Sequence, residues 1–217
     1  MMRRFARRVS VFVAAAIVGM PAARAGAVDI AIAPVVGATR FDSSRERYGW
    51  LSETRPLIGA EATVRQLGWG AGLRAGRTSV NQSSALLGTS LDTRVHLWSV
   101  DAFAEVPLVS IGVVSLGALG SVGQIFASYS PDRALIAADG PGGAVEVRYE
   151  NWNEWSASGG LALRTALTRA VASSLAIERR VFRIDTAHRQ GDAIVESRET
   201  FGGWVARIGL SWRVNLV

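Results

Sequence analysis

The 217-residue chain has no cysteine, no lysine and only two histidines. Without cysteine there are no disulfides, thiolate nucleophiles or sulfur-based zinc sites. Without lysine there is neither Schiff-base chemistry nor the lysine of a phosphate-binding loop. Beyond residue 25, no segment is apolar over the ~18 consecutive residues that indicate a membrane-spanning helix. No metal-ligand spacing occurs either, so the sequence predicts neither a metal site nor a cofactor.

The first residues have the features of an export signal. Met1 to Arg8 carry four arginines, Val9 to Met20 are almost entirely apolar, and Ala23-Arg24-Ala25 is an Ala-x-Ala cleavage site. We therefore predict that residues 1–25 are a cleaved signal peptide and that residues 26–217 form one domain. The alternative is an anchoring N-terminal helix, but the apolar run is shorter than the ~20 residues needed to cross a bilayer.

Removal of the leader changes the charge balance. The leader holds five of the 24 arginines and none of the 18 acidic residues, which leaves 19 arginines against 18 acids. A strongly basic surface is the usual sign of nucleic-acid binding. Because no such excess remains in an exported chain, we exclude nucleic acid as a partner.

The mature sequence alternates apolar and polar residues with period two, which indicates β-strands with two different faces. At the C-terminus Trp204, Ile208 and Trp212 share one face, whereas Arg207 and Arg213 share the other. This segment spans about 13 residues, and a tilted strand needs roughly 9–11 to cross a bilayer. Eight such strands are predicted, at residues 28–36, 58–65, 69–76, 98–106, 114–122, 155–167, 175–181 and 204–216.

Short and long connections alternate along the chain. The predicted short turns are 67–68, 107–110 and 168–170, and the predicted long polar loops are 38–56, 79–93, 124–152 and 185–200. An even number of strands with short turns at one end and long loops at the other is typical of outer-membrane barrels. We therefore predict an all-β fold, an eight-stranded antiparallel up-and-down transmembrane β-barrel. It has three short periplasmic turns and four long extracellular loops, and lies in the bacterial outer membrane.

The third long loop is predicted to contain β-structure of its own. Val145, Val147 and Tyr149 alternate with charged residues and continue the pattern of the strand that begins near Trp155. We expect a strand pair that projects beyond the bilayer. Residues 124–154 carry five acidic residues against two arginines. An acidic hairpin would suit a cationic partner, or divalent ions held by lipopolysaccharide.

Three features indicate that the apolar face points outward to lipid rather than inward, as it would in a soluble barrel. The polar face is rich in glycine, which suits the narrow interior of an eight-stranded barrel. The apolar face carries no charge, which suits lipid because a charge at mid-bilayer is costly, although a protein core would exclude charge as well. Tryptophans lie at strand ends, as expected of aromatic girdles at the two membrane interfaces. The predicted girdle consists of Trp69, Trp98, Trp155, Trp204 and Trp212.

Residues 159–164, 174–180 and 209–214 together resemble the last three strands of the small outer-membrane β-barrel superfamily. This superfamily includes OmpA-type transmembrane domains, OmpX, OmpW and opacity proteins. The resemblance implies contact with outer-membrane lipid and lipopolysaccharide, insertion by the barrel-assembly machinery, and an extracellular partner bound through the loops. Such barrels usually end on an outward aromatic residue that the machinery reads. Here Leu216 has that position, and Trp212 is the last aromatic residue.

The polar face also carries the ionisable residues of the predicted strands. Because buried charges persist only when paired, we expect an ion network that fills a narrow lumen and is mainly structural. A gated pore or a proton-conducting path is the alternative. The predicted network consists of Glu61, Arg65, Arg74, Asp101, Glu105, Arg164, Glu178, Arg180, Arg207 and Arg213. Pairing outward from a turn at 67–68 places Glu61 opposite Arg74, and we predict an ion pair between them.

The sequence favours a non-enzymatic barrel with a structural, surface-interaction or defence role through its loops. One alternative is a narrow channel or transporter for small or hydrophobic solutes. A second is a lipid A-modifying barrel enzyme, which would need a Ser–His pair. His96 and Ser99 fall on opposite faces of their strand, with His96 beside Trp98, and His188 lies in the last long loop. We therefore predict no catalytic residues.

Overall fold

The computed structural model describes residues 28–42, 49–86, 89–137, 144–190 and 193–216. The predicted leader lies outside these ranges. Within them no helix is long and apolar enough to cross a membrane. The strands are β1 (Val28–Phe41), β2 (Thr54–Gln66), β3 (Trp69–Leu86), β4 (Thr89–Ile111), β5 (Val114–Ser130), β6 (Arg133–Ala137), β7 (Ala144–Arg148), β8 (Trp152–Ala166), β9 (Val171–Gln190) and β10 (Ala193–Leu216).

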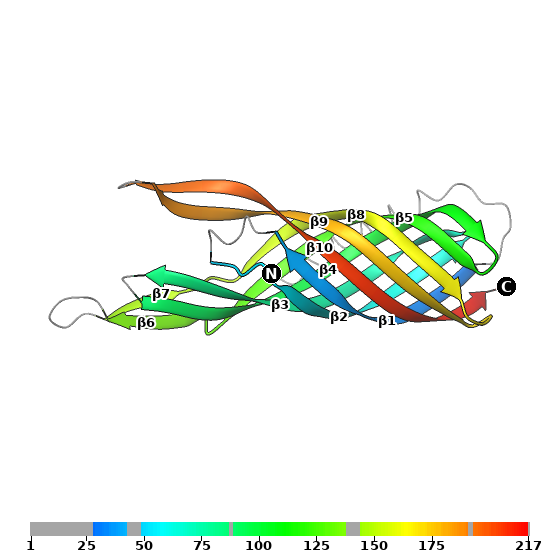
Figure 1. Cartoon of the computed structure of the whole chain (residues 1–217), viewed down its shortest axis with the longest axis horizontal. Helices are drawn as coiled ribbons and strands as arrows, with labels where there is room; N and C mark the ends of the chain where they lie inside the picture. Colours follow the sequence, from blue (N-terminus) through cyan, green and yellow to red (C-terminus); the bar gives the residue numbers. More distant parts are fainter. Residues whose placement is uncertain (1–27, 43–48, 87–88, 138–143, 191–192, 217) are drawn as a thin grey trace.

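Eight of these strands close into a barrel in the order β1-β10-β9-β8-β5-β4-β3-β2 (Figure 1). All pairings are antiparallel, and the barrel closes where β1 pairs with β10. Strands β6 and β7 form a separate two-stranded sheet between β5 and β8 in the chain. The predicted eight-stranded up-and-down barrel is therefore confirmed.

The first short turn joins β2 to β3 as predicted. Leu67 and Gly68 are the two turn residues, and both have positive φ, +50° and +85°. Positive φ at both central residues is the mark of the type I′ turn, whose twist matches that of the flanking strands. The predicted register is also confirmed, with Gln66 opposite Trp69 and Glu61 opposite Arg74.

The second short turn differs from the prediction. Strand β4 continues through the predicted turn at 107–110 as far as Ile111, and Gly112 and Val113 make the turn. Pro107 has no N–H to donate to a ladder, and the register shifts between Pro107 and Val109. The proline is thus accommodated by an irregularity within the strand instead of ending it. The third turn lies between Ala166 and Val171, close to the predicted 168–170.

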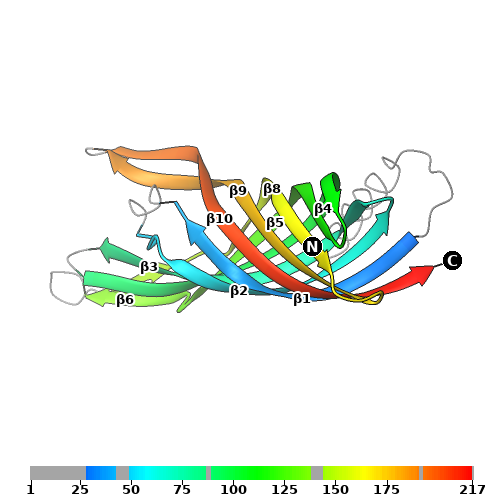
Figure 2. The same ribbon diagram turned by 45° about the vertical axis from the view of Figure 1, so that its right-hand side comes forward.

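Most of the predicted long loops are strand extensions. The pairing of β3 with β4 continues to Leu86 and Thr89, and that of β9 with β10 continues to Gln190 and Ala193. The strand pair predicted in the third loop is confirmed as β6–β7, although it forms its own sheet rather than a continuation of β8. Figures 1 and 2 show these hairpins projecting beyond one end of the barrel, away from the short turns.

The two faces of the barrel wall have opposite character. Inward positions hold small residues such as Ala31, Thr63 and Ser211, together with buried charged residues. Outward positions hold large apolar side chains that are between 38% and 63% exposed, including Ile32, Val36, Ile58, Leu73, Leu161, Ile177, Ile208 and Val214. The charged lumen is thus surrounded by a wall whose outside is apolar.

Candidate functional site

The upper part of the lumen, toward the hairpins, holds an ion cluster centred on Glu178 and Asp101. Both carboxylates are 1% exposed. Arg74 donates to Oε1 and Oε2 of Glu178 at 2.8 and 2.6 Å, and its Nε lies 3.1 Å from Asp101. Arg207 pairs with Glu178, and Arg180 pairs with Asp101. Each buried carboxylate therefore has two arginine partners.

A second cluster lies nearer the short turns and is centred on Glu105, which is also buried. Arg65 lies 2.6 Å from Glu105, and Arg164 lies 2.7 Å from it. Arg164 also reaches Glu61 at 3.3 Å. Thr63 donates a further hydrogen bond to Glu61. These residues come from β2, β4 and β8, so the cluster ties together strands that are far apart around the barrel.

The predicted Glu61–Arg74 ion pair is wrong, although the two residues are directly opposed on β2 and β3. Arg74 also faces Asp101 on its other neighbour, β4, and it extends across the lumen to Glu178 on β9. Asp101 and Glu178 therefore compete with Glu61 of β2 for the Arg74 guanidinium. Glu61 instead pairs with Arg164 from the opposite wall. In a narrow barrel, a contact across the lumen can thus outweigh the contact between adjacent strands.

Nine of the ten predicted network residues belong to these two clusters. The tenth, Arg213, also faces the interior but lies close to the short turns, opposite Ala31. Among the described residues it has no ion-pair partner. Hydroxyl groups complete the upper cluster: Arg74 donates to Ser121 at 2.8 Å and to Ser158 at 3.2 Å. The lumen therefore contains two successive clusters of paired charged and polar side chains, which we together call the ion network.

An apolar cluster, which we call the aromatic plug, fills the lumen on the hairpin side of the ion network. Trp152 stacks against Trp50 with ring centroids 6.4 Å apart, and against Phe182 at 6.2 Å. Its indole N–H donates to the Tyr129 hydroxyl at 3.0 Å. The buried members of the plug are Phe41, Trp50, Val80, Val95, Leu97, Ile125, Ala127, Phe182 and Phe201.

The aromatic plug was missed at the sequence level, although the alternation contains a signal for it. Phe182 has the same strand parity as Glu178 and Arg180, and Trp152 has the same parity as the inward residues of β8. If the predicted strands are extended by a few residues, the same alternation places both side chains on the inward face. The alternation of apolar and polar residues is lost there because the interior changes from polar to apolar at that level.

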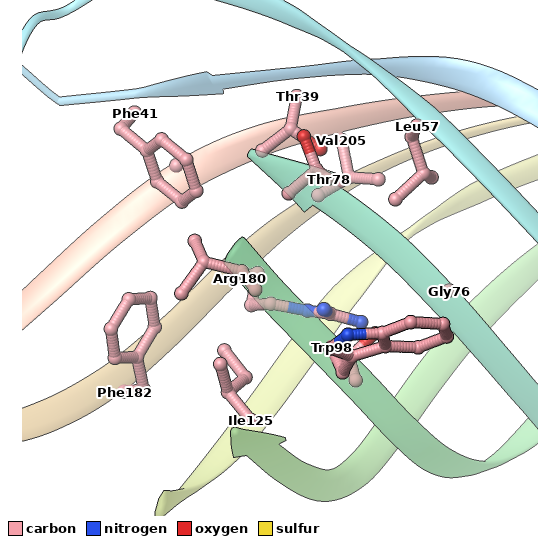
Figure 3. Close-up of a pocket in the computed structure, with 13 residues that line it drawn as sticks. Thr39, Phe41, Leu57, Gly76, Thr78, Trp98, Ile125, Arg180, Phe182 and Val205 are labelled. Atoms are coloured by element: carbon pink, nitrogen blue, oxygen red, sulfur yellow. The ribbon is translucent and has the colours of Figure 1, made fainter. Parts of the chain in front are cut away.

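The described residues of the lumen outline two small cavities. One cavity of about 20 Å³ lies between the plug and the network, lined by Phe41, Ile125, Phe182 and Arg180 among others. In Figure 3, Arg180 lies beside this cavity, with the rings of Phe41 and Phe182 on the side away from its guanidinium. A neighbouring cavity within the network has the same volume. Each has room for about one water molecule.

The five predicted girdle tryptophans all lie on the outside of the barrel, between 41% and 54% exposed. Trp204 and Trp212 on β10 are separated by outward Ala206, Ile208 and Leu210. At about 3.3 Å per residue and a tilt near 40°, the two indoles are roughly 20 Å apart along the barrel axis, close to the ~25 Å height of an apolar membrane band. Between these levels no outward side chain of the eight described barrel strands is charged.

His96 and Ser99 lie on opposite faces of β4. Ser99 is buried in the lumen, whereas the His96 ring is on the outside, where Arg77 approaches its Nδ1 at 3.5 Å. These two residues therefore do not form a Ser–His pair. His188 belongs to β9 rather than to a loop, and its side chain lies outside the described residues. Among the described residues no group of three or more His, Asp or Glu side chains could hold a metal ion.

A closed antiparallel barrel with an apolar belt around its outside defines a class of protein. Soluble proteins rarely expose an apolar surface of this extent, and closure leaves no unpaired strand edge toward lipid. The class is that of transmembrane β-barrels. Within it, the tightly packed interior places this chain among barrels whose small lumen is filled by side chains.

No family model matches the chain, and no curated protein sequence matches it. Solved structures do show similarity. Neisserial surface protein A covers 84% of this chain and 96% of its own, with 14% identity and a TM-score of 0.48. Ail from Yersinia pestis, solved in complex with sucrose octasulfate, covers 88% and 100%, with 15% identity and a TM-score of 0.42. A major outer-membrane protein from Thermus thermophilus covers 85% and 99%, with 12% identity and a TM-score of 0.46.

Proposed function

We propose that this protein is a non-conducting barrel of the bacterial outer membrane that acts through its surface hairpins. The observation that carries the proposal is the double closure of the lumen by the ion network and the aromatic plug. The cavities outlined between these layers by the described residues are about 20 Å³ each. A path for solutes would require both layers to move apart, breaking buried ion pairs on the way.

The hairpins on the far side of the tryptophans support the surface role. Asp42 N–H donates to the Gly202 carbonyl oxygen at the end of the β1–β10 ladder. Beyond Phe182 on β9 and Gly202 on β10, the two strands form ladders only with each other. Eight residues of β9, 183–190, lie in this free part, which is roughly 25 Å long at about 3.3 Å per residue. A two-stranded ribbon has free backbone groups on both edges, and extended partners can add to such edges. The hairpins thus give the barrel a binding surface well clear of the lipid.

Single-channel recording tests the closure of the lumen. In planar bilayers the native chain is expected to show no stable conductance steps, because two packed layers separate the two sides. Combining Phe182→Ala with Arg180→Ala thins both layers, and we expect it to produce measurable conductance. Steady conductance by the native protein would favour the channel alternative over our proposal.

Single-cysteine labelling tests the orientation. The native sequence has no cysteine, so there is no background signal. We expect a membrane-impermeant maleimide to label Arg148→Cys, on the exposed face of β7, in intact cells. The matched variant Arg169→Cys, in the exposed third short turn, should be labelled only after the cells are opened. The reverse pattern would show that the hairpins face the periplasm.

A further inference from the structure

The outward face of β3 and β4, just beyond the tryptophan level, carries a cluster of basic residues. Arg77 lies opposite Trp98 in the β3–β4 ladder, and its guanidinium carbon is 5.1 Å from the centre of the indole ring. His96 and Arg94 follow at the next two outward positions of β4. Below Trp98 the outward residues of this strand, such as Val100 and Ala102, are uncharged. The cluster therefore lies at the edge of the apolar belt.

The two arginines of this cluster lack acidic partners. Among the described residues, neither Arg77 nor Arg94 forms an ion pair. Arg179, which also lies against a girdle tryptophan, differs because Asp42 binds its guanidinium with both carboxylate oxygens. The Arg77 guanidinium lies over the Trp98 ring, and its Nη2 is 3.5 Å from His96 Nδ1. Among the described residues no carboxylate takes up its N–H groups. Such a planar fork matches the oxygens of a phosphate.

A hollow lined by polar side chains and by Leu51 adjoins the cluster. It has a volume of about 460 Å³ and is open to the outside. Its lining includes Asn81, Ser83, Asp92 and Ser130, which supply amide, hydroxyl and carboxylate groups, together with Arg94 and His96. A phosphate alone would fill only a small part of this volume. The amide, hydroxyl and carboxylate groups of the hollow are suitable hydrogen-bond partners for the hydroxyl groups of a sugar, whereas a phosphate does not need them.

We propose that this face binds a phosphorylated glycolipid of the outer leaflet, with the phosphate held by Arg77 and Arg94 and the sugar in the adjoining hollow. The acyl chains would lie along the uncharged belt below Trp98. A lipid is favoured over a soluble anion because the cluster stands on the lipid-facing side of the wall. The inference rests on the membrane orientation in the proposed function, which the cysteine labelling tests independently.

Native mass spectrometry in neutral detergent, with bis-phosphorylated lipid A as the probe, tests the site. The variant Arg77→Gln/Arg94→Gln is expected to weaken binding by at least about tenfold, since each basic residue near a charged lipid surface contributes about fivefold. The control Arg148→Gln/Arg169→Gln removes the same charge elsewhere and should change affinity less than about twofold. Dephosphorylated lipid A should bind the native chain about as weakly as phosphorylated lipid A binds the double variant.

Three results would overturn the proposal. An equal loss in the control variant would mean that net charge alone attracts the lipid. Phosphatidylglycerol binding as tightly as lipid A would remove the need for the sugar in the hollow. Displacement of the lipid by inorganic phosphate at a similar concentration would favour a soluble anion. Both double variants are first checked for folding by the heat-dependent shift of the barrel on gels, because the outward positions should not affect closure.

His96 gives a second readout, which reports on this site alone. Partial burial and the charges of Arg77 and Arg94 lower the pKa of His96 below its usual value. Asp92 is the acidic group of β4 on the same face, and the facing residues Ser79 and Ser128 are uncharged. A bound phosphate would offset the arginine charges, so the pKa of His96 should rise when lipid A is added. An unchanged His96 titration by NMR after addition of lipid A would contradict contact at this site.

Discussion

Replacing Glu178 with Gln is expected to destabilise the barrel by about 3–5 kcal/mol, the usual cost of removing one partner of a buried ion pair. Glu178 is 1% exposed and is bound by Arg74 and Arg207. The two clusters contain five arginines against four carboxylates, so the substitution raises an already unbalanced positive charge. Urea unfolding in detergent micelles measures the change.

The double variant Glu178→Gln/Arg207→Gln separates charge pairing from packing. Because it keeps the net charge of the lumen at its native value, it should cost clearly less than the sum of the two single substitutions. Glu146→Gln is the control, since that side chain on β7 is 52% exposed and lies 3.7 Å from Arg133. We expect a change within about 0.5 kcal/mol for this surface position. Additive single effects in the lumen would show that water, not arginine, solvates Glu178.

Substitution of Gly160 by Ala is expected to cost about 3 kcal/mol or to prevent insertion, because the added methyl group overpacks the wall. Gly160 faces the lumen opposite Glu178. A Cβ atom at Gly160 would overlap the backbone oxygen of Ile177 and lie 2.7 Å from Glu178 Cα. Overpacking usually costs about 1–3 kcal/mol, and the upper end applies because backbone atoms have little freedom to move. Heat-modified mobility on gels and urea unfolding both report the loss.

The neighbouring glycine is the matched control. Gly159 faces outward, and the nearest heavy atom to an added Cβ is the Leu119 backbone oxygen at 4.0 Å. Gly159→Ala should therefore be neutral or slightly stabilising, since alanine restricts the unfolded chain more than glycine does. If the two substitutions had equal effects, the assignment of the inner and outer faces of β8 would be wrong.

The eight-stranded barrel and the direction of its two faces could be read from the sequence because strand periodicity is local. Successive side chains of β10 point alternately into the lumen and outward, whatever strands lie next to it. The outward positions between Trp204 and Trp212 carry no charge because a charge in lipid is costly. The Leu67-Gly68 turn was predictable for the same reason, since two residues fix its geometry. The turn predicted at 107–110 was wrong because a proline is typical both of a turn and of an irregularity within a strand, and the sequence does not distinguish the two.

The ends of the strands could not be fixed in this way. In the β3–β4 and β9–β10 extensions the outward face becomes polar, while the inward face becomes apolar at the plug, with Val80, Val95 and Phe201 buried. The contrast that marks a membrane strand, apolar outside and polar inside, is therefore lost. The inward aromatic residues of the plug then look like loop residues. Only the pairing of β3 with β4, and of β9 with β10, shows that these segments remain strands.

The sequence by itself determined which arginines and carboxylates share the lumen, because side-chain parity assigns each one to a face. Only the tertiary structure decided which of them pair. Glu61 and Arg74 are opposed across adjacent strands, yet Arg74 binds Asp101 and Glu178 while Glu61 binds Arg164. The physical reason is closure: an eight-stranded barrel is so narrow that a long guanidinium reaches the opposite wall as easily as its neighbour. Partner choice then depends on the whole set of charges in the lumen, which no local pattern encodes.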